Sequence, residues 1–488
     1  LRRKWIWKKT KMQTKTFYHI YYNNKMLKAL TLAACVLLNV QAAPAEDEFT
    51  ILPNMTAMST KSYSGYLPVT DSKALHYIFV ESKNQPTTDP VVIWFNGGPG
   101  CSSLLAFFQE NGPWVVGADG NNTIYENPYP WNNNASMLWI ESPAGVGYSI
   151  ANNTADRSTN DMVQSQDAIV ALQAWYNKFP EFWDNPLFVS GESYAGIYVP
   201  YLTWQIYQYN MKANMTGQKS MNIKGFMVGN GATNWDFDVS PSFPETIWNF
   251  NLIPKKYIDF FNANNCTYYF NDFRNHTGPA SCDPVWDAMQ NLTSALNWYD
   301  LYRTTEAPIT AEERIGKTMV AGQEKTYKRG MSQKEYTPWA KFANDRVAND
   351  FLSDYVNNET VREALHIPSY APGWDMCWGS QFTYNLQNEA SMWIYPILKG
   401  AGYKLMFYSG DTDGAVPTYG TKRWLQELNW PVKKAWRPWL TQGQVSGYIE
   451  QYDGLDFVTV KGVGHMAPQW ARQPVTDMIT AWIHGQDF

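Results

Sequence analysis

Short apolar runs alternate with amphipathic segments along the first half of the chain. The runs have the length of strands and end in polar, Gly or Pro residues, at 91–95, 137–141, 187–190 and 223–230. Two helices are expected between them, at 161–179, where apolar residues recur at helical spacing before a proline, and at 194–209. Strands that alternate with helices predict parallel pairing and an α/β sandwich.

Residues 235–350 interrupt this alternation. They carry aromatic helical patterns such as TIWNF and KKYIDFF, which predict a helical insertion, or cap, over the sheet. Residues 311–336 within it are dense in mixed charge and predict a solvated loop, with an excised or nicked segment as the alternative. The pattern resumes with helices at 356–365 and 474–485 and strands at 403–409 and 456–461. The core is therefore expected in two parts, 49–234 and 351–488.

The start of the chain is excluded from this fold. Residues 1–25 read as an upstream extension, and residues 26–42 have the basic start, apolar stretch and small residues of a secretory signal peptide. Cleavage is expected after Ala42, with Ala43 and Ala45 as alternatives. The apolar stretch is too short to span a bilayer, and no later segment predicts a span.

Composition and charge narrow the classes of partner. Removal of residues 1–42 takes away nine of the 39 Lys and Arg residues and none of the 44 Asp and Glu residues, which leaves a net charge of −14. So acidic a chain is a poor partner for nucleic acid or anionic lipid. Aromatic residues make up 16% of the sequence, which predicts clefts lined by rings as well as a dense core.

Sequons and cysteines indicate a lumenal route. Nine N-x-S/T sequons follow the leader, at Asn54, Asn121, Asn134, Asn152, Asn214, Asn265, Asn275, Asn291 and Asn358. Four cysteines also remain, an even number typical of an oxidising compartment. Three pairings are open. We favour Cys266–Cys282 as a local loop and Cys101–Cys377 as a long-range staple, with free buried thiols as the alternative.

A candidate nucleophile lies directly after the apolar run at 187–190. In the sequence GESYAG, Ser193 has the bare positions Gly191 and Ala195 on either side, as the tight turn of a nucleophile elbow requires. An ordinary strand-to-helix turn competes with this interpretation, because Ala stands where the usual motif has Gly. A serine nucleophile also needs a base, and the base needs an orienting acid.

Two later loops supply candidates for both roles. Asp411 and Asp413 follow the strand at 403–409, and His465 follows the strand at 456–461. Because ligands bind at the carboxyl ends of parallel strands, these loops and Ser193 are expected to converge on one edge of the sheet. The order Ser, Asp, His is that of α/β-hydrolases. The other histidines after the leader read as ordinary polar positions: His76, His276, His366 and His484.

A glycine-rich turn, WFNGGPGCSSL, follows the strand at 91–95. Such a turn exposes backbone N–H groups to developing negative charge, so Gly98 and Tyr194 are the candidate oxyanion-hole donors. A phosphate-binding loop is the alternative, but no G-K-[ST] follows and the acidic chain offers no basic clamp. The sequence calls for no cofactor, and no clustered His and Asp set predicts a metal site.

Five motifs in this order resemble the serine carboxypeptidases of the α/β-hydrolase fold: WFNGGPGCSSL, ESPAGVGYS, GESYAGIYVP, SGDTDGAVP and GVGHMAP. The resemblance runs from about Phe49 to the C-terminus and is weakest over 235–350. It implies a mostly parallel central sheet flanked by helices, and an exopeptidase that releases one C-terminal residue through an acyl-enzyme on Ser193. It favours Asp413 over Asp411 as the triad acid and supports the Cys101–Cys377 bridge. The implied binders of the substrate's terminal carboxylate are Asn96, Gly97, Glu110 and Glu192.

Glu192 beside Ser193 then has a chemical explanation. Two carboxyl groups that face a third cannot all be ionised, so at least one of Glu110 and Glu192 should be protonated and donate to the substrate. Binding should weaken as the pH rises towards neutral. The expected protein is an acid-active carboxypeptidase for peptide and protein C-termini, lysosomal, vacuolar or secreted, with a homodimer left open. The alternatives are an acyltransferase that uses the same acyl-Ser193 and a catalytically silent protective or binding protein.

Overall fold

The computed structural model describes residues 43–116, 124–270, 276–303, 352–377 and 382–488, and the backbone of 315–320 and 323–328. The upstream extension and signal peptide expected at 1–42 lie outside these residues. No helix in the described ranges is long and apolar enough to cross a membrane.

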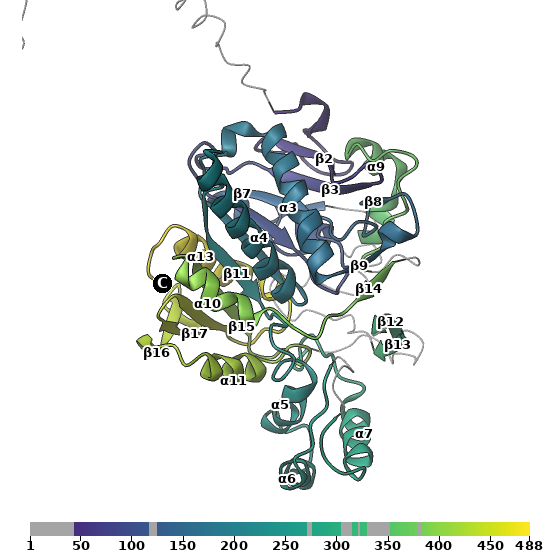
Figure 1. Ribbon diagram of the computed structural model, residues 1–488, viewed down its shortest axis with the longest axis vertical. Coiled ribbons are helices and arrows are strands. Elements are labelled where there is room, and N and C mark those ends of the chain that lie inside the picture. Colours follow the sequence, from purple (N-terminus) through teal and green to yellow (C-terminus); the bar gives the residue numbers. More distant parts are fainter. Residues whose placement is uncertain are drawn as a thin grey trace, which may run out of the picture.

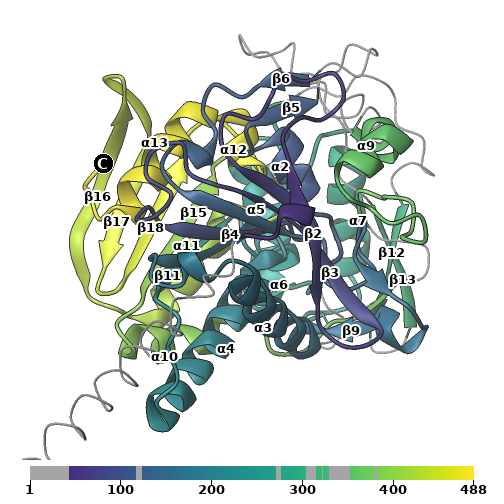
Figure 2. The ribbon, with the colours of Figure 1, turned by 90° about the horizontal axis from the view of Figure 1, so that it is seen from above.

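A mixed sheet of 12 strands forms the centre of the molecule (Figures 1 and 2). Its order is β1 (Glu48–Phe49), β2 (Ser62–Pro68), β3 (Lys73–Val80), β7 (Ser136–Ile140), β4 (Val91–Phe95), β10 (Leu187–Glu192), β11 (Ile223–Gly229), β15 (Lys404–Gly410), β18 (Leu455–Val460), β17 (Gln444–Tyr452) and β16 (Val432–Thr441), with β8 (Ile150–Ala151) beside β3. Pairing is parallel from β7 to β18 and antiparallel at both ends. The predicted α/β-hydrolase fold and its parallel strands are confirmed.

The central strands are apolar throughout because both of their faces are covered. In β4, Val91, Ile93 and Phe95 join the core beside α3 (Asp161–Lys178) and α4 (Ala195–Thr216), whereas Val92 and Trp94 join the core beside α2 (Leu104–Gln109) and α13 (Arg472–Ile483). Alternate side chains of a strand point to opposite faces, so a strand between two helical layers reads as an unbroken apolar run.

Most of the predicted helices are present in this arrangement. Helix α3 begins after Asn160, whose side chain accepts a hydrogen bond from the Val163 amide. Helix α4 extends beyond the predicted end to Thr216 and is capped by Gly217, which has a φ of 71°. Further helices of the two core parts are α9 (Glu359–Ala364), α10 (Tyr395–Gly400), α11 (Thr418–Leu428) and α12 (Ala467–Trp470), and residues 352–357 are also helical.

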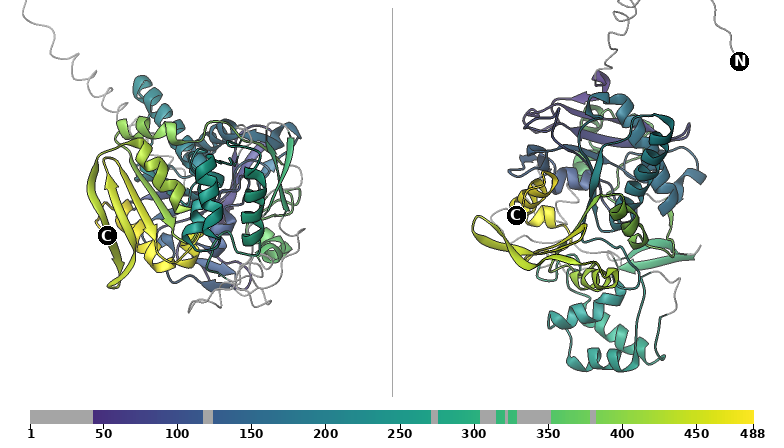
Figure 3. Two further views of the ribbon diagram at one scale, coloured as in Figure 1. Left: turned by 90° about the horizontal axis from the view of Figure 1, so that it is seen from below. Right: turned by 60° about the vertical axis from the view of Figure 1, so that its left-hand side comes forward.

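The insertion begins with three helices that lie together at one end of the molecule (Figures 1 and 3). These are α5 (Phe243–Asn249), α6 (Lys255–Asn264) and α7 (Cys282–Thr293). They share a small apolar core, and the expected Cys266–Cys282 disulfide joins the end of α6 to the start of α7.

The predicted loop at 311–336 is wrong over two stretches of backbone. β12 (Ile315–Val320) and β13 (Gln323–Lys328) form an antiparallel hairpin, and β12 also pairs with β14 (Thr383–Asn385), which pairs with β9 (Ser158–Asn160). The Ile, Thr, Val and Tyr residues of these stretches favour strands. The loop was predicted because charged residues of both signs lie between them.

Several antiparallel hairpins were not predicted, among them β2 with β3. β5 (Trp114–Val116) pairs with β6 (Ile124–Glu126), and β16 pairs with β17 at the outer edge of the main sheet, where Figure 3 shows a long curved arm. Strand β16 is largely exposed and includes Lys433, Lys434 and Pro438.

Candidate active site

Ser193 occupies the turn between β10 and α4. Its φ is 63°, a left-handed conformation that is rare for serine and typical of a nucleophile elbow. The neighbouring loop holds this turn from both sides: the Ser193 amide donates to the Gly229 carbonyl at 3.0 Å, and the Ser193 carbonyl accepts from the Ala232 amide at 3.0 Å. The surrounding structure therefore fixes the strained residue.

The small residues around Ser193 are required by close packing. A Cβ on Gly191 would lie 2.4 Å from the Phe95 carbonyl oxygen and 2.7 Å from the Ala195 Cβ. A Cβ on Gly196 would lie 2.5 Å from the Ala232 carbonyl oxygen. Ala195 fits where the usual motif has glycine, so the departure at this position leaves the turn intact.

His465 and Asp413 lie at the ends of the adjacent strands β18 and β15 and form a buried pair. His465 Nδ1 is 2.7 Å from Asp413 Oδ2, which also accepts from Asn230 Nδ2 at 2.8 Å. The carboxyl group of Asp411 instead accepts from the Gly462 amide at 2.7 Å. Of the two candidate acids, Asp413 is thus the one in contact with the imidazole. His465 Nε2 makes no hydrogen bond to the described part of the chain.

A single cavity of about 500 Å³ brings the predicted nucleophile, base and oxyanion-hole donors together. Ser193, His465, Gly98 and Tyr194 all line it. Much of the rest of its wall is aromatic and comes from the insertion and the segments beside it: Phe243, Phe270, Trp286, Trp298 and Tyr299. The helices of the insertion therefore stand over the reactive edge of the sheet and shape the space in front of Ser193.

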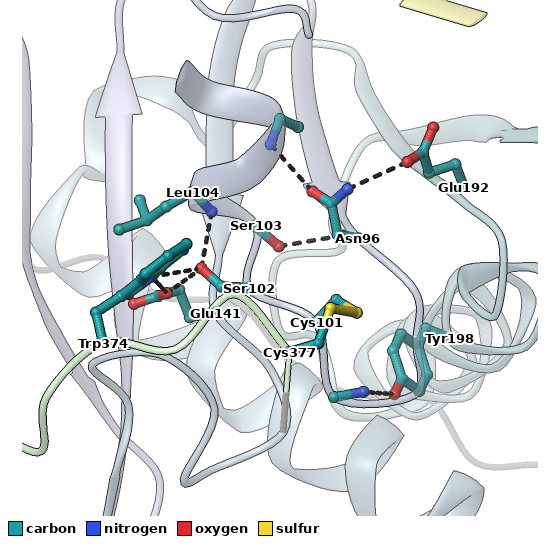
Figure 4. The surroundings of a disulfide bond; sticks show 12 residues. Asn96, Cys101, Ser102, Ser103, Leu104, Glu141, Glu192, Tyr198, Trp374 and Cys377 are labelled. Carbon is teal, nitrogen blue, oxygen red and sulfur yellow. Dashed lines mark hydrogen bonds between the residues drawn. A yellow bond between two sulfur atoms is a disulfide. The ribbon is translucent and has the colours of Figure 1, made fainter. Parts of the chain in front are cut away.

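A buried amide and two buried carboxyl groups form a cluster that includes Glu192, the residue before Ser193, but none of the three is among the residues that line the cavity. Asn96 Nδ2 lies 2.9 Å from Glu110 Oε1 and 3.3 Å from Glu192 Oε1, and Figure 4 shows the amide directed at Glu192. Their second oxygens, Glu110 Oε2 and Glu192 Oε2, are buried and make no hydrogen bond to the described part of the chain.

Burial governs the protonation of this pair. Burial raises the pKa of Glu110 to about 7, against the hydrogen bond from Asn96 that lowers it. Burial, followed by the charge of Glu110, raises the pKa of Glu192 well above its ordinary value. At acidic pH the pair therefore holds at least one proton.

The expected Cys101–Cys377 disulfide ties the glycine-rich turn to a distant segment (Figure 4). Next to it, Ser102 Oγ donates to the Glu141 carboxylate, and Trp374 Nε1 donates to Ser102 Oγ at 2.9 Å. These contacts stabilise the turn that carries Gly98. Sequence reasoning missed Glu141 and Trp374, although Glu141 lies in the quoted motif ESPAGVGYS.

His76 was read as an ordinary polar position, but it lies in a second Ser–His–acid arrangement. His76 Nε2 is 2.9 Å from Ser64 Oγ, and Nδ1 is 2.8 Å from Glu141 Oε2. The Ser64 hydroxyl donates to the Leu365 carbonyl at 2.7 Å, so His76 Nε2 must donate to Ser64 Oγ. All three side chains are buried. The arrangement is therefore structural, because Ser64 is closed to solvent and its proton is already committed.

The other histidines and most of the sequons lie near the surface. His366 Nδ1 is 3.1 Å from the Ser64 carbonyl oxygen, His484 Nε2 is 3.0 Å from the Asn134 carbonyl oxygen, and His276 Nε2 is 3.5 Å from Asp283. Six sequon asparagines are exposed: Asn54, Asn152, Asn214, Asn265, Asn291 and Asn358. Asn134 is half-buried, and Asn121 and Asn275 lie outside the described residues. Glycosylation stays a prediction.

Comparison with known proteins agrees with this geometry. Residues 53–485 match the family model described as serine carboxypeptidase. The chain is 35% identical over 468 residues to the lysosomal protective protein of Mus musculus, covering 92% of this chain and 96% of that protein. It is 33% identical to serine carboxypeptidase 1 of Hordeum vulgare, covering 91% and 94%.

A solved structure supports the fold. The crystal structure of a prohormone-processing carboxypeptidase from Saccharomyces cerevisiae superimposes with a TM-score of 0.70 at 19% identity, covering 91% of this chain and 96% of that one. The family match across the chain and the two curated relatives decide the assignment: this chain belongs to the serine carboxypeptidase family.

Proposed function

We propose that the protein is an acid-active carboxypeptidase that cleaves the last peptide bond of its substrate through an acyl-enzyme on Ser193. His465 removes the proton from Ser193 Oγ as Oγ attacks the scissile carbonyl, and gives it to the nitrogen of the departing amino acid as the C–N bond breaks. Asp413 orients the imidazole through the 2.7 Å contact at Nδ1. The backbone N–H groups of Gly98 and Tyr194 stabilise the oxyanion. Water then hydrolyses the acyl-enzyme, with His465 as the general base.

The buried Asn96–Glu110–Glu192 cluster is the observation that favours an exopeptidase. A terminal carboxylate needs a donor near the scissile bond; a protonated carboxyl group of this cluster supplies one, and the Asn96 amide, which donates to both Glu110 and Glu192, orients the pair. Loss of the shared proton would leave two anions facing a third. We therefore expect KM to rise from acidic to neutral pH, while substrates without a free carboxylate gain nothing from the cluster.

The aromatic wall of the cavity favours a bulky apolar side chain next to the scissile bond. Phe243 and Trp286 have ring centroids 5.2 Å apart, and Trp298 lies 4.8 Å from Phe243. Rings at this spacing form a continuous apolar surface that a large substrate side chain can cover.

The route through the cell is proposed from several features together. A signal peptide is expected at 26–42, six sequon asparagines are exposed, and two disulfides are present. The mouse relative is named a lysosomal protein. We propose a lysosomal, vacuolar or secreted protein, in agreement with an acidic working pH.

The decisive assay is release of the C-terminal amino acid from an N-blocked dipeptide at mildly acidic pH. The wild type should release it, and Ser193→Ala should not. The same dipeptide with a C-terminal amide is the matched substrate control and should be cleaved with a much higher KM. Equal cleavage of the acid and the amide would contradict the carboxylate-binding role of the cluster.

Two alternative functions are tested by the same preparation. The mouse relative is named a protective protein, so a non-catalytic, stabilising role of this chain is the second alternative. If folded wild type releases no amino acid, addition of an alcohol or amine acceptor distinguishes acyl transfer, which forms a new ester or amide, from a silent protein, which forms none.

A further inference from the structure

One short segment of the insertion lies across both loops that carry Asp413 and His465. This segment, Asn297–Arg303, follows α7 and is named here the clamp segment. The Gly414 amide donates to the Trp298 carbonyl at 2.9 Å, and the Leu301 amide donates to the Thr412 carbonyl at 2.9 Å. The His465 amide donates to the Tyr299 carbonyl at 2.7 Å. The clamp segment is thus bonded to residues on both sides of Asp413 and to His465 itself.

Two glycines allow the clamp segment to approach this closely. A Cβ on Gly464 would lie 1.9 Å from the Tyr299 carbonyl oxygen, and a Cβ on Gly414 would lie 2.8 Å from Leu301 Cδ2. Each glycine is adjacent in sequence to a member of the Asp413–His465 pair. The glycines beside the acid and the base therefore serve packing against the insertion.

Asp300 anchors the segment through its side chain. Asp300 is buried, its Oδ1 accepts from Thr412 Oγ1 at 2.7 Å, and its Oδ2 accepts from Arg303 Nε at 2.8 Å. The Arg303 guanidinium in turn lies 4.1 Å from the centre of the Trp470 ring, in α12 just after His465. One carboxylate thereby joins the acid loop to the element that follows the base.

We propose that the clamp segment is a positioning element that fixes the separation of Asp413 and His465, with Asp300 and Thr412 as its side-chain contact. Trp298 and Tyr299 also line the cavity, and the Tyr299 ring lies 4.8 Å from the His465 ring. A substrate side chain that packs on these rings therefore contacts the segment whose backbone is hydrogen bonded to the loops of Asp413 and His465. This inference rests on the proposed function, and it makes the fit of the substrate side chain a determinant of kcat as well as of KM.

The test compares Thr412→Val with Thr412→Ser, since valine removes only the hydroxyl contact and serine keeps it. The rate at which a phosphonofluoridate labels Ser193 reports the nucleophile without any peptide substrate. We expect Thr412→Val to be labelled at least about tenfold more slowly than wild type, with Thr412→Ser close to wild type. Asp300→Ala should behave as Thr412→Val does, and Asp354→Asn, at an exposed aspartate, is the control.

A spectroscopic readout separates positioning from general destabilisation. The proton between His465 Nδ1 and Asp413 Oδ2 should give a downfield NMR signal that shifts or is lost in Thr412→Val and is retained in Thr412→Ser. Labelling and signal unchanged in folded Thr412→Val overturn the proposal, even if Asp300→Ala fails to fold. A wild type that is labelled quickly but releases no amino acid refutes the proposed peptidase and leaves this test intact.

Discussion

Gly97 and Tyr194 approach each other so closely that a Cβ on Gly97 would lie 2.3 Å from the Tyr194 nitrogen. This nitrogen is a candidate oxyanion-hole donor, so Gly97→Ala should displace it or block its N–H. Loss of one such donor costs about 10²- to 10³-fold in kcat. The measurement is kcat for an N-blocked dipeptide at pH 5, with circular dichroism to establish that the variant is folded.

Gly400→Ala is the matched control for this substitution. Gly400 ends α10, and a Cβ built there has no atom within 4 Å. The control should keep wild-type kcat. Wild-type activity in Gly97→Ala would show that the Tyr194 amide is not placed as the reaction requires.

The proposed dependence of KM on a proton held by Glu110 and Glu192 can be tested with an isosteric substitution. Glu110→Gln removes the group whose pKa lies near 7 and keeps a donor that does not titrate, so KM for the free-acid dipeptide should rise less than in wild type between pH 5 and 7.5. The wild-type KM should rise as the pH passes about 7, the value to which burial raises the pKa of Glu110. Glu427→Gln, at an exposed position on α11, should follow the wild-type curve. A flat wild-type curve would eliminate the shared proton.

Buried carboxyl groups should make the fold more stable in acid than at neutral pH. Burial raises the pKa of Asp238 to about 7 and of Asp161 to about 6, in addition to Glu110. Between the unfolded and the raised pKa values the folded state binds more protons, so stability falls as the pH rises from about 4.5 to 7. Each such group lowers the free energy of unfolding by about 1.4 kcal/mol per pH unit in this window. Thermal unfolding at pH 5 and pH 7.5 measures the effect; a higher melting temperature at pH 7.5 would contradict it.

Trp286 is expected to contribute to the preference for bulky apolar substrates. It lies in α7, lines the cavity and contacts the Phe243 ring. Trp286→Ala should lower kcat/KM for Phe-containing dipeptides by about 10- to 100-fold relative to Ala-containing ones. A panel with Phe, Leu or Ala on either side of the scissile bond measures the change. Trp436→Ala, on the exposed β16, should leave the preference unaltered.

The buried contact between His76 and Glu141 is expected to stabilise the fold without serving catalysis. Glu141 also accepts from Trp374 Nε1 at 3.0 Å, so Glu141→Ala leaves several donors without a partner. Removal of one member of a buried ion pair costs about 3–5 kcal/mol, measurable by denaturant unfolding at pH 5. Ser193→Ala should be as stable as wild type. A serine-directed reagent should label Ser193 and not Ser64.

The strands and loops with the clearest sequence signals were predictable. β4, β10, β11, β15 and β18 read as apolar runs because both faces of each are buried, and the candidate catalytic residues lie in the loops that follow them. The β16–β17 hairpin gave no such signal. Its outer strand is exposed, and its turn uses Gln442 at a φ of 51° before Gly443, where Asn or Asp would have been the recognisable residue.

The candidate site also has residues that the sequence predicted and a segment that it did not. Ser193 and His465 were predicted because each follows a strand and the order Ser, Asp, His matches α/β-hydrolases, whereas the family resemblance favoured Asp413 over Asp411. The clamp segment was not predicted, because its bonds to the loops of Asp413 and His465 are made largely by backbone atoms, which carry no sequence signature. Asp300 and Arg303 lie more than 100 residues from the loops they contact, and single-sequence patterns do not report such distances.

The outer strand of the main sheet has a consequence for self-association. A sheet of 12 strands offers two open rims to which a strand of another molecule could add. At one rim β1 has only two residues, and at the other β16 presents adjacent Lys433 and Lys434 and lacks an amide hydrogen at Pro438. Both rims discourage continuation of the sheet, so a homodimer of this chain would have to form through faces and helices rather than through shared strands.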